Sequence, residues 1–241
     1  MLDIRHLEWS PLGEGVIRDI DLHIDDGKMV VVTGPNGGGK TSLAKLIAGI
    51  NQPTGGHIYF NGEDITQLNI TERAKRGIAY AFQQPVRFKG LSVQDLLDTA
   101  AGRSLSEEET CELLGRVGLC ANEYEDRELS ASLSGGEIKR IEIASVLARQ
   151  AQLSIFDEPE AGIDLWSFTK LVETFNELRQ KQKGTLLVIS HQERILEIAD
   201  EIVVVANGYV RAAGDRKVIL PALLADERAA RCPWGKEGER V

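Results

Sequence analysis

Residues 34 to 41 have the types and spacing of a phosphate-binding loop. The segment reads Gly34-Pro35-Asn36-Gly37-Gly38-Gly39-Lys40-Thr41 and matches G-x-x-x-x-G-K-[ST] at every specified position, with Ser42 following it. Glycines let backbone N–H groups point inward around the β- and γ-phosphates of a nucleotide, and Lys40 adds a mobile ammonium group. The Thr41 hydroxyl is a ligand type for Mg²⁺. A glycine-rich turn before a helix is the simpler alternative, which the flanking elements help to weigh.

Two adjacent acids, Asp157 and Glu158, end the short apolar stretch 153–156. A carboxylate near the magnesium is the second requirement of phosphoryl transfer. Asp157 would hold the metal directly or through water, and Glu158 would polarise the water that attacks the γ-phosphate. Adjacent acids at a strand end are often only solvated residues. Together with the phosphate loop, the catalytic interpretation is favoured.

The elements around the loop come in the order that a phosphate site needs. The run Met29-Val30-Val31-Val32 before it is unbroken and mostly β-branched, as in a strand buried in a parallel sheet. After the loop, apolar residues recur at helical spacing: Leu43, Leu46, Ile47 and Ile50. Strand, glycine loop and helix therefore follow one another, which favours nucleotide binding over a plain turn.

The remaining chain alternates between helical and strand patterns. Helical spacing at 138–147 and 168–178 alternates with strand patterns at 153–156 and 185–189, which predicts an α/β fold with a doubly wound sheet. Alternating residues near Ile20 to Ile24 predict a half-buried strand, residues 92–118 a helical insertion, and 202–212 a hairpin. We expect one domain, made of a core with a β subdomain at about 1–84 and 138–228, a helical subdomain at about 85–137, and a frayed tail at about 229–241.

A further motif makes the chain resemble the ATP-binding cassette (ABC) ATPases, over nearly all of residues 2–213. The family's signature pentapeptide reads Leu133-Ser134-Gly135-Gly136-Glu137 here, with Glu137 in place of the commoner Gln. The resemblance implies a P-loop NTPase fold of ABC type, with a RecA-like core, an N-terminal antiparallel β subdomain and a small helical subdomain. It also implies that this segment contacts the γ-phosphate held by another protomer. A Ser hydroxyl, glycine N–H groups and a helix N-terminus suit an anion receptor.

The other landmarks of the family follow in order. Gln83 matches the Q-loop glutamine, which reaches the metal or the attacking water. Asp164 closes the segment Ala161-Gly162-Ile163-Asp164, which matches the D-loop at the dimer interface, and His191 matches the switch histidine that orients Glu158. A lone His at a strand end is more often a surface residue, but its place in this order favours the switch. Two positions for the adenine ring stay open with equal weight. The ring would stack on Trp9, or it would be held by Val16 and other aliphatic residues.

The resemblance implies a Mg²⁺-dependent ATPase whose active site is shared between two copies. Lys40, Glu158 and His191 are the expected catalytic residues, and Thr41, Gln83 and Asp157 the expected metal ligands. ATP is held by the loop and by Gln83, and faces the signature of the other copy. One chain carries one cassette, so we expect a homodimer or another ABC dimer to form on ATP binding.

Particular residues in and next to these motifs resemble those of the SufC-type ATPases of iron–sulfur cluster assembly. ATPases of that type work with scaffold proteins of the SufB/SufD kind. The residues that carry this resemblance are Ala81-Phe82-Gln83-Gln84-Pro85-Val86, the run Ile138-Lys139-Arg140 after the signature, Arg127, and the segment from Phe156 to Trp166. The helical insertion is shorter than in that branch. The alternative partner is a transmembrane permease, which would make the chain the nucleotide-binding subunit of a membrane transporter.

Composition limits the other classes of function. The 241 residues carry a formal net charge of −9, which argues against a nucleic-acid binder with a basic face. No apolar stretch approaches the roughly 20 residues of a membrane span, and the N-terminus has no signal-peptide core. The three cysteines form no CxxC pair, which leaves free thiols as the expectation. We expect a cytoplasmic protein, peripheral to a membrane only if its partner is a permease.

Overall fold

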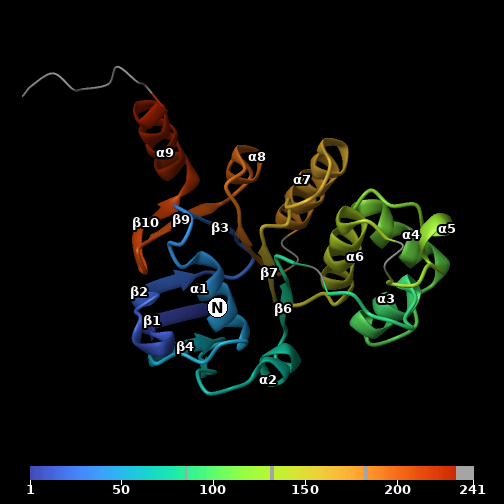
Figure 1. The fold of residues 1–241 in the computed structure, drawn as a ribbon, viewed down its shortest axis with the longest axis horizontal. Coiled ribbons are helices and arrows are strands. Elements are labelled where there is room, and N and C mark those ends of the chain that lie inside the picture. Colours follow the sequence, from blue (N-terminus) through green and yellow to red (C-terminus); the bar gives the residue numbers. More distant parts are fainter. Residues whose placement is uncertain (85, 131–132, 182–183, 232–241) are drawn as a thin grey trace, which may run out of the picture.

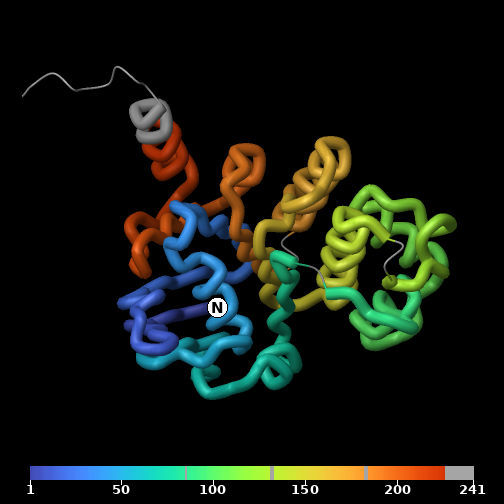
Figure 2. Tube along the Cα trace, viewed as in Figure 1, coloured from blue at the N-terminus to red at the C-terminus, as the bar shows by residue number. Residues whose placement is uncertain are grey.

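In the computed structural model, all strands of the described residues belong to one mixed sheet. The model describes residues 1–84, 86–130, 133–181 and 184–231, with side chains of the last range up to residue 225. Within these ranges ten strands pair in the order β5-β4-β1-β2-β10-β9-β3-β8-β7-β6. Figure 1 shows the sheet, and Figure 2 follows the path of the chain. None of the helices in the described ranges has the length and apolarity needed to cross a membrane.

The two ends of the sheet differ in strand direction. At one end the pairing is antiparallel, in β1 (Leu2–Trp9), β2 (Ile17–Ile24), β4 (Gly55–Phe60) and β5 (Glu63–Asp64). At the other end it is parallel, in β3 (Met29–Thr33), β8 (Thr185–Ile189), β7 (Leu153–Asp157) and β6 (Ile78–Ala81). The hairpin of β9 (Glu201–Ala206) and β10 (Tyr209–Asp215) joins them. The predicted α/β fold and terminal hairpin are confirmed.

The parallel and antiparallel strands differ in how many of their faces are buried. Every residue of β3, β7 and β8 is buried, because helices cover both faces of that part of the sheet. In β2 the buried residues are Ile17, Ile20, Leu22 and Ile24, a largely alternating pattern that leaves polar residues on the other face. The alternation predicted for this strand is therefore confirmed.

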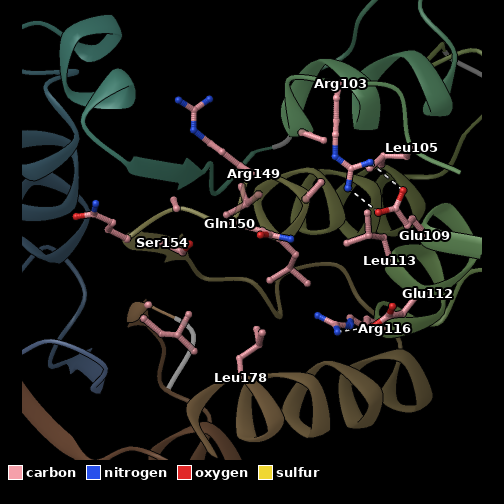
Figure 3. A pocket seen from close by; sticks show the side chains of 18 residues that line it. Arg103, Leu105, Glu109, Glu112, Leu113, Arg116, Arg149, Gln150, Ser154 and Leu178 are labelled. Atoms are coloured by element: carbon pink, nitrogen blue, oxygen red, sulfur yellow. Dashed lines mark hydrogen bonds and ion pairs between the residues drawn. The ribbon is translucent and has the colours of Figure 1, made fainter. Parts of the chain in front are cut away.

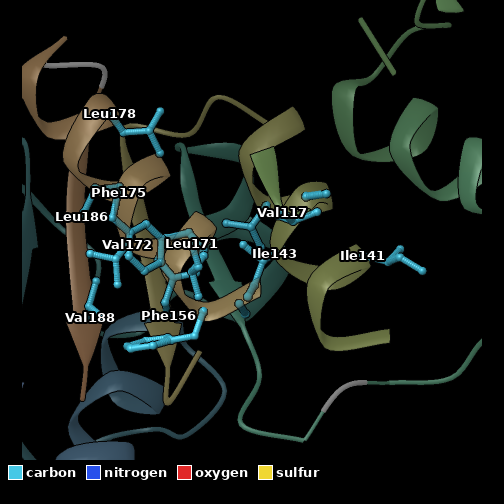
Figure 4. Close-up of a cluster of buried hydrophobic side chains, with 14 of the residues drawn as sticks. Val117, Ile141, Ile143, Phe156, Leu171, Val172, Phe175, Leu178, Leu186 and Val188 are labelled. Atoms are coloured by element: carbon cyan, nitrogen blue, oxygen red, sulfur yellow. The ribbon is translucent and has the colours of Figure 1, made fainter. Parts of the chain in front are cut away.

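Helices from distant parts of the sequence pack on the parallel strands. Helix α1 (Lys40–Ala48) lies against one core cluster, and α6 (Gly135–Ala148) and α7 (Leu165–Gln180) lie against another. The second cluster is drawn in Figure 4, where Phe156 of β7 meets Phe175 of α7. Their ring centroids are 4.9 Å apart. The helix predicted at 138–147 begins three residues earlier, at Gly135.

A group of short helices projects from the sheet where a helical insertion is predicted. They are α3 (Val93–Ala101), α4 (Glu107–Arg116) and α5 (Ala121–Tyr124). In Figure 1 they lie on the far side of α6 from the strands, and α3 and α4 contact α6. The short helices α2 (Ile70–Lys75) and α8 (Glu193–Leu196) complete the connections between strands.

The frayed tail expected at about 229–241 stays a prediction, and the last helix of the described residues reaches its first three residues. Helix α9 (Arg216–Arg231) follows β10 and continues to Arg231. Pro221 lies inside this helix, and the half-buried side chains of Ile219, Leu220 and Leu223 pack against the core. Residues 232–241 of the predicted tail, with Cys232, lie outside the described residues.

A buried arginine fixes the far end of the phosphate-loop helix. The Arg73 guanidinium is fully buried and donates to the carbonyl oxygens of Leu46 at 2.6 Å and Ile47 at 3.0 Å, near the C-terminus of α1. It also donates to the carbonyls of Leu68 and Thr66, at 2.9 and 2.8 Å. Burial lowers the pKa of Arg73 to about 10, so the group stays charged near neutral pH. One side chain thus satisfies four backbone acceptors.

Replacing this arginine tests how much the anchor contributes. Arg73→Ala leaves buried carbonyls without donors, so we expect unfolding free energy to fall by about 3 to 5 kcal/mol. Arg76→Ala is the matched control, because Arg76 directly follows α2, the helix that carries Arg73, and pairs with the exposed Glu63. Its expected cost is below about 1 kcal/mol. Urea denaturation measures both, and equal losses would contradict the anchor.

Candidate functional site

The loop between β3 and α1 is held close to the β9–β10 hairpin. A Cβ atom at Gly34 would lie 2.2 Å from the carbonyl oxygen of Val205, so only glycine fits there. Gly39 has φ +106, a conformation that side chains disfavour, and precedes the first helical residue, Lys40. The ammonium of Lys40 donates to the carbonyls of Gly34 and Pro35, at 2.8 and 2.9 Å. Burial lowers the pKa of Lys40, which Glu158 and Asp157 oppose.

A cavity of about 410 Å³ opens in front of this loop. Its lining consists of Val16, Asn36, Gly37, Gly38, Gly39, Lys40, Thr41, Ser42, Gln83 and Glu158. Most predicted phosphate-binding residues therefore meet around one space, while Gly34 and Pro35 lie behind it as acceptors for Lys40. Val16 belongs to the lining; Trp9 is half-buried at the end of β1 and does not. This placement favours Val16 over Trp9 as a neighbour of whatever occupies the cavity.

The first acid lies beneath the cavity floor. Asp157 is fully buried at the end of β7 and accepts hydrogen bonds from the Thr41 hydroxyl at 3.1 Å and the Tyr80 hydroxyl at 2.8 Å. Burial raises the pKa of Asp157, and these two hydrogen bonds oppose the rise. Tyr80 on the neighbouring strand β6 was not predicted, because its contact with Asp157 spans 77 positions of the sequence.

The second acid faces the cavity. Glu158 has φ +46, a strained conformation for a non-glycine residue, and its carboxylate accepts a hydrogen bond from the Gln83 amide at 2.7 Å. His191 follows β8, and its Nδ1 atom lies 3.5 Å from the hydroxyl of Thr33 at the end of β3. His191 is exposed and is not part of the cavity lining. The structure thus joins Gln83 to Glu158 and places His191 at the adjacent strand end.

The signature residues form the N-terminus of α6. The Ser134 hydroxyl accepts a hydrogen bond from the Glu137 N–H at 3.3 Å, and the Ser134 N–H donates to the Glu137 carboxylate at 2.7 Å, a reciprocal capping box. Hydrogen bonds from Tyr124 and Ser134 lower the pKa of Glu137 to about 2. Leu133 is buried beside the cap, and Gly135 and Gly136 are the first helical residues. Ser134 to Glu137 are not among the residues that line the cavity.

The D-loop segment packs against this helix start. A Cβ atom at Gly136 would lie 2.6 Å from the carbonyl oxygen of Gly162. Asp164 caps α7 by accepting from the N–H groups of Trp166 and Ser167, each at 3.0 Å. The Ser167 hydroxyl accepts a hydrogen bond from Arg140 of α6 at 2.8 Å. Signature and D-loop are therefore one connected surface.

Two further charged residues were not predicted as part of the site. Lys139 of α6 is 1% exposed, and its ammonium donates to the carbonyl of Phe82 and contacts those of Gln83 and Asp157 at 3.4 Å. Glu142, one turn later, accepts from the Phe82 N–H at 2.9 Å. Burial lowers the pKa of Lys139 and raises that of Glu142. A Lys and a Glu on an otherwise apolar helix face are the signal that could have identified them.

A larger cavity, of about 580 Å³, lies between the projecting helices and the core (Figure 3). Four of its charged residues pair with each other, since Arg103 contacts Glu109 and Arg116 contacts Glu112, both at 2.5 Å, and Arg149 donates to the carbonyl of Ala74. It contains neither the glycine loop nor the carboxylates of β7. Size alone does not make this cavity the functional site, because the phosphate-binding groups surround the smaller one.

Comparison with known proteins defines the class. The family model for ABC transporters matches residues 17–161. An ABC transporter ATP-binding protein of Methanocaldococcus jannaschii is 39% identical over 213 residues, which cover 85% of this chain and 84% of the relative. The chain belongs to the ABC transporter family, whose cassettes are ATPases, and it is an ATP-binding cassette with ATPase activity.

Two more likenesses add detail. The Escherichia coli protein named "Probable ATP-dependent transporter SufC" is 32% identical over 230 residues, which cover 89% of this chain and 92% of that protein. A dimeric ATP-binding cassette solved in a post-hydrolysis state with ADP and Pi superposes with a TM-score of 0.80. It is 21% identical and covers 90% of this chain and 99% of its own. The last likeness confirms the fold.

Removing the loop ammonium tests the site. In Lys40→Ala, a charge-assisted contact to phosphate is lost, so we expect ATP affinity to fall by about tenfold to a hundredfold. Titration calorimetry measures the affinity. Lys45→Ala, near the other end of the same helix, is the control and should bind ATP as the parent does. Unchanged affinity in Lys40→Ala would show that the loop does not cradle the phosphates.

Proposed function

We propose that two copies of this chain close around ATP and that hydrolysis reopens them. In this proposal the loop of one copy and the signature Ser134 to Glu137 of the other hold the same γ-phosphate. Glu158 orients and deprotonates the attacking water, Lys40 balances phosphate charge, and His191 and Gln83 position Glu158 and the water. Asp164 holds the D-loop at the interface between the copies.

The observation that carries this proposal is the separation of the two halves of the site. The cavity is lined by the loop, Gln83 and Glu158, whereas the anion-receptor end of α6 is not part of the lining. The Ser134 hydroxyl accepts from its own helix, so its hydrogen is available for an outside acceptor. A second copy would supply this missing donor set, as the dimeric assembly of the similar cassette supports.

The donor set also suits Mg²⁺. The Thr41 hydroxyl in the cavity lining and the Asp157 carboxylate beneath it are 3.1 Å apart, and Gln83 also lines the cavity. Hard oxygen ligands of this kind are those that Mg²⁺ prefers, with phosphate oxygens and water completing the shell. When bound, Mg²⁺ would neutralise phosphate charge. The chain's own part is to hold Asp157 ionised, which the hydrogen bonds from Tyr80 and Thr41 support.

A substitution at Glu158 separates binding from hydrolysis. Glu158→Gln keeps the hydrogen bonding of the side chain but removes its basicity, so we expect turnover to fall about a hundredfold or more with ATP still bound. A closed dimer should then accumulate with Mg²⁺ and ATP, as measured by sedimentation velocity. Turnover at the parent rate would contradict the role of Glu158. Glu193→Gln, beyond His191, is the control.

We further propose that the cycle drives a scaffold of iron–sulfur cluster assembly of the SufB/SufD kind. The likeness to SufC supports a scaffold of this kind as the partner, and the residues in and next to the motifs agree with it. A groove of about 150 Å³ beside the Q-loop supplies a partner surface, with Val86 and Phe88 48% and 40% exposed at its rim. Its floor includes Glu142, which holds the N–H of Phe82 next to Gln83. A partner in this groove would therefore act on the residue that contacts Glu158.

The alternative is a permease in the same groove. The names of the relatives favour it, because they are called transporter proteins. The two candidates differ in the protein that stimulates hydrolysis. A scaffold without membrane spans, or a permease in detergent, is added to the purified chain and phosphate release is followed.

Phe88 tests the groove in that assay. We expect the scaffold to stimulate hydrolysis and Phe88→Ser to need about tenfold more scaffold for the same effect, because an exposed aromatic anchor is lost. The basal rate should not change. Val218→Ser on α9 is the matched control for an exposed apolar residue. Stimulation by the permease alone would contradict the scaffold proposal and leave the ATPase cycle intact.

A further inference from the structure

Two apolar side chains beside the D-loop are exposed. Leu165 and Trp166, the first residues of α7, are 68% and 84% exposed. The other described tryptophan, Trp9, is half-buried against the core of the β subdomain. An indole of this exposure leaves a large apolar area in water, which favours burial against another surface.

Several hydrogen bonds hold the turn that carries them. Asp164 accepts hydrogen bonds from the N–H groups of Trp166 and Ser167 and from the Ser167 hydroxyl at 2.7 Å. Arg140 of α6 donates to the Ser167 hydroxyl at 2.8 Å and to the Gly118 carbonyl at 3.0 Å. The following turn is tied to α8, because Arg194 donates to the Thr169 hydroxyl at 2.9 Å. A backbone turn that is held in place before contact loses little conformational entropy on binding.

Their position relative to the signature identifies what covers them. Gly136 of the signature approaches the Gly162 carbonyl so closely that no Cβ fits, and Arg140 also donates to the Gly136 carbonyl at 3.3 Å. Leu165 and Trp166 are therefore held through Asp164, Ser167 and Arg140 to the same helix start that must reach a phosphate on another copy. When that helix start reaches the phosphate, the adjoining side chains approach the same copy.

We infer that Leu165 and Trp166 form an apolar contact with a second copy of this chain when two copies close around ATP. The inference rests on the proposed function, since it uses the shared site. In a two-fold dimer each contact occurs twice, so one substitution removes two. The contact would add affinity that the phosphate and the signature do not supply. Tryptophan is suited to such an anchor because it buries a large area with few rotatable bonds.

The test uses the full chain carrying Glu158→Gln, which holds ATP without turnover. Sedimentation velocity with Mg²⁺ and ATP gives the dimer dissociation constant. Adding Trp166→Ala should raise this constant by about tenfold or more, while ATP affinity, measured below the dimerisation range, stays unchanged. Leu165→Ser should act in the same direction. Val218→Ser is the matched control, as a 70% exposed aliphatic residue on α9, and should leave the constant unchanged.

The outcomes separate this inference from the proposed function. If the Glu158→Gln chain stays monomeric with ATP, the shared site is wrong and the inference falls with it. If that chain dimerises and Trp166→Ala and Leu165→Ser leave the constant unchanged, only the apolar contact is overturned. Melting curves exclude unfolding as the cause of a weaker dimer.

Discussion

The buried ammonium of Lys139 connects the parts of the site that come from different elements. It reaches from α6 to the carbonyls of Phe82, Gln83 and Asp157, so the signature helix, the Q-loop and the end of β7 share one cation. Burying a charge costs free energy unless hydrogen bonds and an opposite charge offset it. Here three carbonyls and Glu142, at 3.7 Å, provide that compensation. Displacing α6 from the core would leave these groups unpaired, which makes their relative position well defined.

This connection gives a physical route between the groove lined by Val86 and Phe88 and the carboxylate of Glu158. Glu142 holds the N–H of Phe82, the next residue is Gln83, and the Gln83 amide donates to Glu158. A protein seated on Phe88 and Val86 would contact the same short segment. Movement of the segment after β6 would change whether Gln83 holds Glu158 or releases it toward water. Lys139 belongs to α6 and contacts the Phe82 and Gln83 carbonyls, so the signature helix is tied to the same segment.

The sequence was most informative where the chemistry is contiguous. Gly34 to Thr41 and Asp157-Glu158 are short runs whose residue types and order already specify phosphate and metal chemistry, and the structure gathers them at one cavity. Tyr80 and Lys139 contact Asp157 from 77 and 18 positions away, which no local pattern encodes. The capping box of α6 was within reach, since Ser134 and Glu137 have S-x-x-E spacing before an apolar run. Helix α9 was missed because it contains Pro221, a residue that usually ends or kinks a helix.

Glu137 sets an electrostatic constraint on the proposed shared site. A carboxylate at this position accepts from both the Ser134 N–H and the Tyr124 hydroxyl, which fixes the start of α6, but it adds negative charge where a phosphate must approach. Arg127 opposes this cost: its guanidinium lies 4.6 Å from the centre of the Tyr124 ring and helps to lower the pKa of Glu137. Two chains of net charge −9 repel each other only weakly beyond the roughly 8 Å Debye length of physiological salt. Charged groups close to the contact, such as Glu137 and Arg127, therefore matter more for closing of the two copies than the net charge does. In the proposed dimer, the helix dipole, Arg127 and Arg140 would favour the phosphate, and the exposed surface of Trp166 would add attraction that carries no charge.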